Sequence, residues 1–391
     1  MNPGGTGGAP FPDRCVVPGP PPAVGRSDGS EYRLGRPSTY LDIYPTYDYL
    51  SLGDVNGDRR PDLLASTDGD LHLYLATGPA TLGALMPLES GLTSGGYRAG
   101  AHFALVDADE GLDVVAAHAR GMSVVWNDGS GDLSRFALTP GPPTTQPVVV
   151  DVDLDGDMDV VGLRSDFTMT NDVVLFYFNG GDGGFTTGEL VLGAHLYRLR
   201  VADVTGDYLP DLIVVSGNDA TISVHAQVEG GTFELAGELP VGISPSFNVW
   251  LATGDLDGDG LVDLVIVQDE DEPDIEHVWI SHQRNGGLEP PRAVTEIPKG
   301  AGNIAGGAVL VSDLNLDGLA DIAFTSSAFD MVAMLKRSDG SYRLAQTEFP
   351  TAASILDLAI AVGDVNCDGC PDLLGAQVDQ LVLFPGVACA H

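Results

Sequence analysis

A nine-residue acidic motif recurs along this 391-residue chain and constrains its fold more than any other feature. The pattern is Asp-x-Asp/Asn-x-Asp-x-x-x-Asp, and its clearest copy runs from Asp255 to Asp263, directly before the apolar run Leu264–Val267. Full or nearly full copies begin at Asp54, Asp151, Asp203, Asp255, Asp313 and Asp364, and a degenerate copy begins at Asp107. Successive starts lie 44 to 58 residues apart, and a period of this size is typical of a repeat architecture.

Each repeat has the same predicted order of elements. A short strand enters the acidic loop, a second strand leaves it, a third follows, and a Gly-rich hairpin turn such as Asn179–Gly184 precedes a fourth. Gly and Asn suit such turns because they tolerate positive φ. Four strands in each of seven repeats predict an all-β fold, a seven-bladed β-propeller of four-stranded antiparallel blades.

The two ends of the chain complete this scheme. The last repeat lacks a fourth strand, and Gly29–Gly35 is similar to the fourth-strand segment Gly340–Ala345 of the sixth repeat. We therefore expect an N-terminal strand to complete the last blade and close the ring, which removes open sheet edges. The predicted domains are a Gly/Pro-rich arm at 1–28 and a propeller at 29–391. Its blades are expected at about 47–99, 100–145, 146–196, 197–246, 247–305, 306–354, and 355–391 together with 29–36.

Composition limits the partners of this chain. Its 56 acidic and 18 basic residues give a formal net charge of −38, which argues against nucleic acid and anionic membrane surfaces. No stretch approaches the roughly 20 apolar residues that span a bilayer, so no transmembrane segment is expected. The start of the chain lacks a secretory signal, and we expect a leader to have been removed from an extracellular or cell-surface protein. We expect the protein to be monomeric.

The acidic loops offer the hard oxygen ligands that Ca²⁺ prefers. Side chains at positions 1, 3, 5 and 9 and the carbonyl group at position 7 can wrap one ion, and Gly at position 4 or 6 allows a tight turn. The side-chain donors are Asp54, Asn56, Asp58 and Asp62; Asp151, Asp153, Asp155 and Asp159; Asp203, Thr205, Asp207 and Asp211; Asp255, Asp257, Asp259 and Asp263; Asp313, Asn315, Asp317 and Asp321; and Asp364, Asn366, Asp368 and Asp372. The carbonyl donors are Arg60, Asp157, Leu209, Leu261, Leu319 and Cys370.

Simple turns, EF-hands and other metals explain the acidic loops less well than strand–loop–strand calcium sites do. Asp and Gly favour tight turns, which would explain one copy but not six with the same donor positions. An EF-hand requires a Glu at position 12 and flanking helices, Mg²⁺ prefers a rigid octahedron, and Zn²⁺ requires His or Cys. We therefore predict about six Ca²⁺ sites. The copy at Asp107 is read as two residues shorter, because Asp113 follows too soon, and is expected to be empty or to bind weakly.

The motifs Gly53–Asp62, Gly254–Asp263 and Gly363–Asp372 resemble the FG-GAP/VCBS repeats of integrin α-subunit propellers and of many bacterial secreted proteins. The resemblance covers residues from about 30 to 391. It implies a calcium-binding propeller, whereas its members serve adhesion, carbohydrate binding or, as accessory domains, enzymes.

The four cysteines predict two disulfides. Cys15 and Cys389 lie near the ends that close the ring, so we expect them to be bonded, with two free thiols as the alternative. Cys367 and Cys370 lie within the last loop. We expect a local disulfide there, since neither a second Cys/His pair nor a strand-to-helix turn accompanies them, as zinc or redox chemistry would require.

No catalytic residues are predicted. The eight histidines form no metal-binding pair at helical spacing, and no Gly-x-Ser-x-Gly motif occurs. The first hypothesis is a module that binds a protein or a glycan, with structural calcium and no enzyme activity. The alternative is a secreted polysaccharide-active lyase or hydrolase, or an accessory domain of one. Candidate ligand segments on the rim opposite the loops are Tyr40–Tyr49, Arg164–Asn171 and the acidic insertion Gln268–Glu276.

Overall fold

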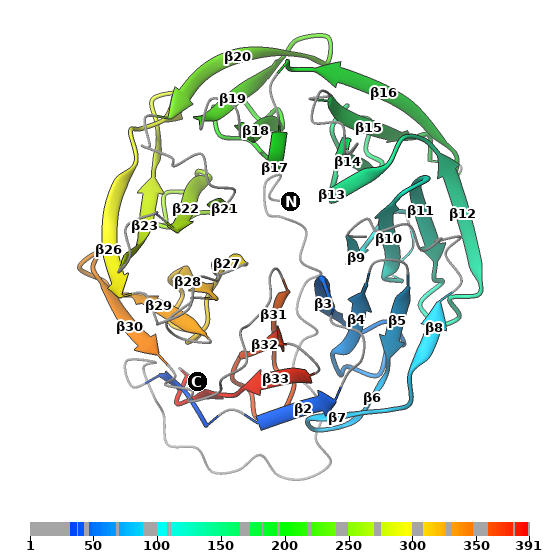
Figure 1. Ribbon diagram of the computed structural model, residues 1–391, viewed down its shortest axis with the longest axis vertical. Helices are drawn as coiled ribbons and strands as arrows, with labels where there is room; N and C mark the ends of the chain where they lie inside the picture. The colour runs from blue at the N-terminus through cyan, green and yellow to red at the C-terminus, as the bar shows by residue number, and fades with distance from the viewer. Residues whose placement is uncertain are drawn as a thin grey trace.

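The computed structural model shows a ring of β-sheets (Figure 1). It describes residues 32–36, 38–42, 47–67, 70–88, 100–107, 109, 111–164, 173–181, 183–193, 196–216, 221–239, 249–269, 275–298, 308–325, 331–346, 359–377 and 380–389. Most of two candidate ligand segments, Arg164–Asn171 and Gln268–Glu276, and the middle of Tyr40–Tyr49 lie outside these ranges. No helix that could cross a membrane occurs within them.

Seven four-stranded antiparallel sheets form the blades, which confirms the predicted architecture. Blades 1 to 3 contain β3 (Tyr49–Gly53), β4 (Asp62–Ser66), β5 (Leu71–Tyr74) and β8 (Met86–Leu88); β9 (Ala101–Ala104), β10 (Asp113–His118), β11 (Gly121–Trp126) and β12 (Arg135–Pro140); and β13 (Thr144–Val150), β14 (Asp159–Arg164), β15 (Val173–Asn179) and β16 (Phe185–Val191). Blades 4 and 5 contain β17 (Leu196–Ala202), β18 (Asp211–Ser216), β19 (Thr221–Val228) and β20 (Thr232–Leu239); and β21 (Val249–Gly254), β22 (Asp263–Asp269), β23 (Ile275–Ser281) and β26 (Arg292–Pro298).

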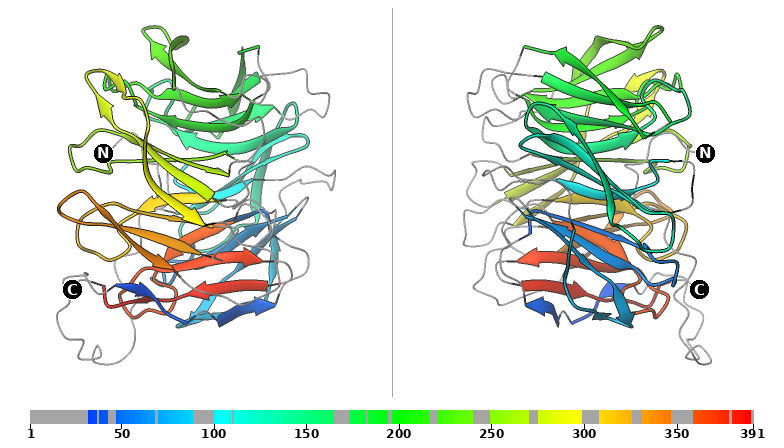
Figure 2. Two further views of the ribbon diagram at one scale, coloured as in Figure 1. Left: turned by 60° about the vertical axis from the view of Figure 1, so that its left-hand side comes forward. Right: turned by 90° about the vertical axis from the view of Figure 1, so that its right-hand side faces the viewer.

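Blade 6 contains β27 (Val309–Ser312), β28 (Asp321–Phe324), β29 (Val332–Lys336) and β30 (Tyr342–Gln346), and blade 7 contains β31 (Ile360–Gly363), β32 (Asp372–Gln377), β33 (Gln380–Phe384) and β2 (Ser38–Asp42). Short hairpins join β6 (Ala76–Gly78) to β7 (Thr81–Leu82) and β24 (Gln283–Arg284) to β25 (Gly287–Leu288). The inner strands face the centre of the ring and the long outer strands wrap its circumference (Figure 1), and Figure 2 shows the ring from two further sides.

The prediction that residues 29–36 complete the last blade was wrong. Residues 33–34 form β1, which pairs only with β34 (Gly386–Val387), whereas β2 pairs with β33 and is the fourth strand of blade 7. Tyr32 is fully buried in the cluster between blades 6 and 7, and its hydroxyl donates to the Pro371 carbonyl. The internal similarity identified a segment that packs beside blade 7, and the chain then continues to the strand that pairs with β33.

The hydrophobic core is divided between the blades. Seven clusters of buried apolar side chains each join one blade to the next, and the cluster that contains Leu63 and Leu374 joins blade 1 to blade 7. Second and third strands such as β10 and β11 are buried along their whole length, because a neighbouring blade covers each face. Outer strands such as β12 are largely exposed. The alternating apolar segments of the sequence therefore make contacts between blades.

Candidate metal centres in the first-to-second strand loops

Each acidic loop joins the first strand of a blade to the second, where the carboxylate at position 1 organises the turn. In all six complete loops its two oxygens accept hydrogen bonds from the backbone N–H groups of positions 5 and 6, over 2.6–3.2 Å. Positions 4 and 6 have positive φ in each of these loops, including the non-glycine residues Arg59, Leu154, Tyr208, Leu316 and Cys367. Glycine is therefore favoured at both positions, and the backbone of any other residue is strained there.

The carboxylate at position 5 holds the next part of the loop. Its Oδ1 accepts a hydrogen bond of 2.8–3.0 Å from the backbone N–H of position 7 in all seven repeats. Positions 1 and 5 thus gather several carboxylate oxygens at the same end of the turn. Ligand oxygens of Asp151, Asp153 and Asp159 lie within 4.8 Å of one another, as do those of Asp255, Asp257 and Asp259. This spacing and the all-oxygen donor set fit a hard divalent cation.

The aspartate at position 9 has a second, structural role in every blade. Its Oδ2 accepts a hydrogen bond from the N–H of position 2, and its Oδ1 accepts one from a backbone N–H within two residues of the end of the third strand. All seven side chains are at most 1% exposed. Burial raises the pKa of Asp62 and Asp321 to about 7 and that of Asp372 to about 8, despite these two N–H donors.

The degenerate loop is not shortened, so its predicted starting residue was wrong. The Val106 N–H bonds to Asp113 Oδ2 as position 2 bonds to position 9 elsewhere, and Asp109 N–H bonds to Asp107 Oδ1 as position 5 bonds to position 3. The loop therefore begins at Leu105, which replaces the position-1 aspartate. Positions 3, 5 and 9 keep their carboxylates, and only the residue that caps the turn is missing.

An amide side chain after or near the end of the third strand joins neighbouring blades. Asn127 Nδ2 of blade 2 donates to the Val55 carbonyl at position 2 of the loop in blade 1, over 2.8 Å. Asn179 Nδ2 bonds the Val106 carbonyl over 3.0 Å, and Gln227 Nε2 bonds the Val152 carbonyl over 2.8 Å. The sequence interpretation missed these inter-blade clasps. Their signal was an amide at the same place in successive repeats.

The cysteine pairings were also predicted wrongly. Cys370 is bonded to Cys389, so neither the Cys367–Cys370 nor the Cys15–Cys389 pair forms. Cys367 is disulfide-bonded as well, and Cys15 lies outside the described residues. The observed bond joins position 7 of the last loop to the segment after β34. Cys389 is fully buried there, and it approaches Cys370 because β34 turns back toward the loop.

Comparison with known proteins agrees with this geometry. The family model for the FG-GAP-like repeat matches residues 106–162, 203–266, 255–324 and 313–375. The chain belongs to this family. The matched segments begin near the acidic loops and extend through the buried second strands, so the family pattern and the observed loops coincide in this FG-GAP propeller.

Solved structures share the fold at low identity. One is an Agrocybe aegerita lectin that recognises non-reducing terminal N-acetylglucosamine, with 18% identity, a TM-score of 0.52, and coverage of 77% of this chain and 80% of the lectin. Another is BBS1N in complex with ARL6DN, with 11% identity, a TM-score of 0.56, and coverage of 94% and 100%. No curated protein matches this FG-GAP propeller.

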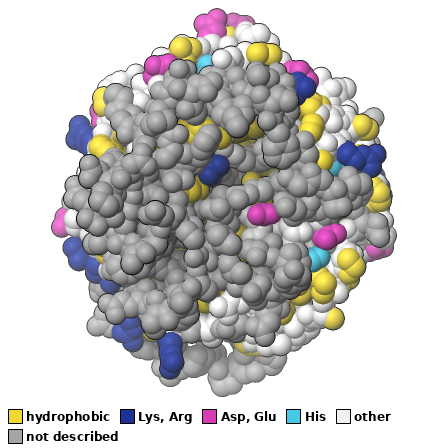
Figure 3. Space-filling model, viewed as in Figure 1, with side chains coloured by type: hydrophobic (Ala, Val, Ile, Leu, Met, Phe, Trp, Pro, Cys, Tyr) yellow, Lys and Arg dark blue, Asp and Glu magenta, His cyan; other side chains and the backbone are white. Residues whose placement is uncertain are grey.

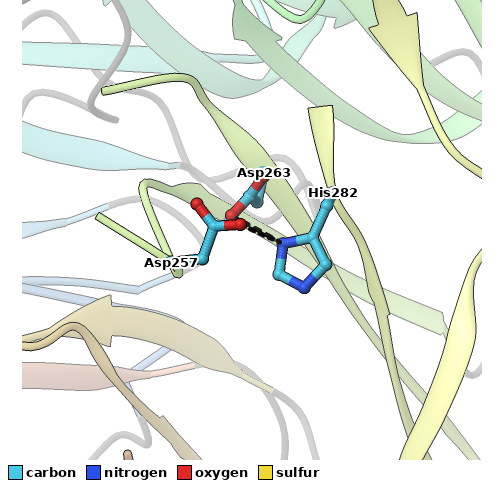
Figure 4. Close-up of side chains that lie close together, drawn as sticks. All are labelled: Asp257, Asp263 and His282. Carbon is cyan, nitrogen blue, oxygen red and sulfur yellow. Dashed lines mark hydrogen bonds and ion pairs between the residues drawn. The ribbon is translucent and has the colours of Figure 1, made fainter. Parts of the chain in front are cut away.

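The loop in blade 5 departs from the others because two basic side chains face it. His282 Nδ1 lies 3.0 Å from Asp263 Oδ2 and 3.6 Å from Asp257 Oδ2 (Figure 4). Arg284 forms an ion pair with Asp257 and a second one of 2.6 Å with Asp259. Burial would raise the pKa of Asp257, but the hydrogen bond and charge of Arg284 outweigh it, and the pKa is lowered. The position-3 and position-5 carboxylates here already have a cation partner within the protein.

Proposed function

We propose that this FG-GAP propeller is an extracellular recognition module whose acidic loops bind structural Ca²⁺. The observation that carries the proposal is the convergence of carboxylates at positions 1, 3 and 5 on a turn held by their own backbone hydrogen bonds, as in Asp255, Asp257 and Asp259. Empty carboxylates at this spacing repel one another, so binding of an ion is coupled to folding. The six complete loops keep an oxygen donor at each of these positions, with Asn or Thr at position 3 in four of them, and would place about six ions around the ring.

An extracellular location follows from the same features in this proposal. A disulfide joins Cys370 to Cys389, and disulfides persist in oxidising compartments, where calcium is also abundant. The net charge of −38 would oppose a compact fold without cations. In the space-filling view, acidic side chains lie mainly at the edge of the visible face (Figure 3).

Recognition of a glycan is the first role to test, since the similar lectin recognises N-acetylglucosamine. Recognition of a protein is the second, since BBS1N was solved in a complex with ARL6DN. We propose a binding role without catalysis. A glycan array probed with calcium-loaded and chelated protein, with each bound glycan checked for cleavage, tests these points together. Calcium-dependent binding without products supports the proposal, and turnover of a glycan would overturn the non-catalytic role.

Metal content gives the complementary test. Elemental analysis of protein dialysed against calcium should find about six ions, and Asp259→Ala should remove about one, because each loop wraps a single ion. A calcium content near zero, or a melting temperature that chelator does not change, would contradict structural calcium.

A further inference from the structure

Two arginines on one inner strand stand out in a protein with so few basic residues. β17 carries Arg198 and Arg200, which flank the fully buried Leu199. Alternate side chains point to opposite faces of a strand, so the two arginines lie on the other side of β17 from Leu199. β17 is an inner strand next to the centre of the ring (Figure 1). Leu199 packs between blades 3 and 4, so both cations lie on the face of β17 that is turned toward blade 5, beside the centre of the ring.

A pair of β-bulges sets this arrangement. The register of β13 shifts between Thr145 and Val148, where Gln146 has a φ of 53°, and the register of β17 shifts between Leu196 and Arg198. The Gln146 side chain bridges to β17, donating from Nε2 to the Tyr197 carbonyl over 2.5 Å and accepting from the Leu199 N–H over 3.2 Å. Bulges re-aim side chains and are frequent beside functional sites.

Arg200 has no carboxylate partner among the described residues. Its Nη1 donates to the Leu199 carbonyl over 2.8 Å, whereas its Nε is buried and makes no hydrogen bond. Burial, followed by the charge of Arg198, lowers the pKa of Arg200 to about 10. Arg200 as a whole is half-buried. Cations taken partly out of water are usually paired, and this chain has 56 acidic residues with which to pair one. An unpaired guanidinium here therefore calls for a ligand.

Aromatic side chains lie beside Arg198. Arg198 lies over the Trp250 ring of β21 at 5.7 Å and over the Tyr197 ring at 5.8 Å. Trp250 is 6% exposed, and its Nε1 has no hydrogen-bond partner. Across the ring, Tyr49 of β3 and His102 of β9 form an edge-to-face pair with ring centres 5.8 Å apart.

Besides burial, the positive charge of Arg200 lowers the pKa of a histidine in another blade. Burial first, and then Arg200, lower the pKa of His102 to about 4, and Tyr49 partly offsets the lowered pKa of Arg200. His102 and Tyr49 belong to blades 2 and 1, so the charge of Arg200 acts on inner strands of other blades.

We propose that this channel cluster binds the carboxylate of an acidic sugar, with Arg200 as the anion-binding residue and Arg198 and Trp250 beside it. The inference rests on the proposed glycan recognition and names the class of sugar. A guanidinium matches the planar carboxylate through paired hydrogen bonds. The net charge of −38 repels a polyanionic chain, so a ligand with a single carboxylate suits the site.

Titration of the calcium-loaded full chain with glucuronic acid tests the proposal, observed by saturation-transfer NMR and calorimetry. The matched ligands are glucose, which lacks the carboxylate, and glucuronate methyl ester, which hides it. We expect glucuronate alone to bind, and Arg200→Gln to weaken binding at least tenfold while Arg292→Gln, a change in an exposed outer-strand residue, has no effect. Equal binding of the ester or glucose overturns the proposal without any variant.

The remaining outcomes separate this inference from the proposed function. If N-acetylalanine binds as well as glucuronate, the cluster recognises carboxylates of peptides, and the acidic sugar is wrong. If Arg200→Gln stays folded by near-UV circular dichroism and binds glucuronate as the unaltered protein does, Arg200 is not the anion-binding residue. Calcium-dependent binding of neutral glycans together with no binding of glucuronate would leave the recognition function standing and overturn the channel site.

Discussion

Asn127 of blade 2 donates a 2.8 Å hydrogen bond to the Val55 carbonyl in the loop of blade 1, and the same side chain bonds the Leu112 carbonyl of its own loop over 3.2 Å. Asn127 is 2% exposed. One amide therefore holds two neighbouring acidic loops in a fixed relation, and Asn179 repeats the arrangement between blades 2 and 3. Each of these loops is therefore stabilised in part by a side chain of the next blade.

Removal of this clasp should destabilise the ring. Asn127→Ala leaves the buried Val55 carbonyl without its partner, so the free energy of unfolding should fall by about 1–3 kcal/mol. Chemical denaturation in saturating calcium measures the change. Asp128→Ala, in the exposed part of the same hairpin, is the control and should have little effect. A loss confined to Asp128→Ala would show that the hairpin, and not the clasp, is responsible.

The second loop should gain a metal site from one substitution. Leu105 is 39% exposed and occupies position 1, while Asp107, Asp109 and Asp113 already occupy positions 3, 5 and 9. Leu105→Asp restores the missing carboxylate and should add about one calcium ion per chain, measured by elemental analysis. Leu235→Asp, which adds the same charge on an exposed outer strand, should leave the calcium content unchanged. An unchanged content in Leu105→Asp would contradict the loop alignment.

Arg284 should compete with calcium in blade 5. Its guanidinium pairs with Asp257 and Asp259, and ion pairs screened by solvent contribute little, so the expected change in calcium affinity is about fivefold at most. Arg284→Gln should therefore tighten one calcium site by about that factor in competition with a chromophoric chelator. Arg292→Gln is the matched control. Weaker calcium binding in Arg284→Gln would mean that the arginine supports the site instead.

The Cys370–Cys389 bond should stabilise the last blade. It closes a loop with a sequence separation of 19, and a cross-link of this size contributes about 3 kcal/mol by restricting the unfolded chain. The paired variant Cys370→Ser/Cys389→Ser should unfold at a lower temperature by calorimetry. Peptide mapping without reductant provides the check on connectivity, and a peptide in which Cys389 is joined to Cys15 would contradict this structure.

Calcium-free protein should lose stability as the pH rises. The pKa of Asp62 and Asp321 is raised to about 7 and that of Asp372 to about 8, mainly by burial, whereas an unfolded aspartate titrates near about 3.9. The folded state thus binds more protons between these values. The contribution of these groups is complete below about pH 4 and is lost as the pH rises toward 8.

Thermal melts in chelator across this range measure the effect, and calcium should abolish most of it because the ion neutralises the loops. Asp62→Asn should flatten the chelator profile while Asp128→Asn, a change at an exposed position, should not. A chelator profile that rises steadily from pH 4 to 8 would show that other groups dominate.

The sequence determined the architecture because the period and the loop residues are local signals. Each Asp-rich turn lies between two apolar strands, and the buried second strands at Asp211–Ser216 and Asp263–Asp269 begin at position 9 as the motif predicts. The number of blades followed from the number of motifs. The chemistry of the donors, such as Asp151, Asp153 and Asp159, also followed from residue type and spacing alone.

Only the tertiary structure decided which distant residues meet. The Cys370–Cys389 bond, the closure by β2, the clasp from Asn127 to Val55 and the cluster around Arg200 all join segments whose approach depends on the packing of whole blades. The sequence did not show that Leu105 occupies position 1 of its loop. That place is defined by the Val106–Asp113 hydrogen bond and not by the Leu105 side chain. The local sequence determines the turns and strands, whereas closure of the ring determines which distant residues come into contact.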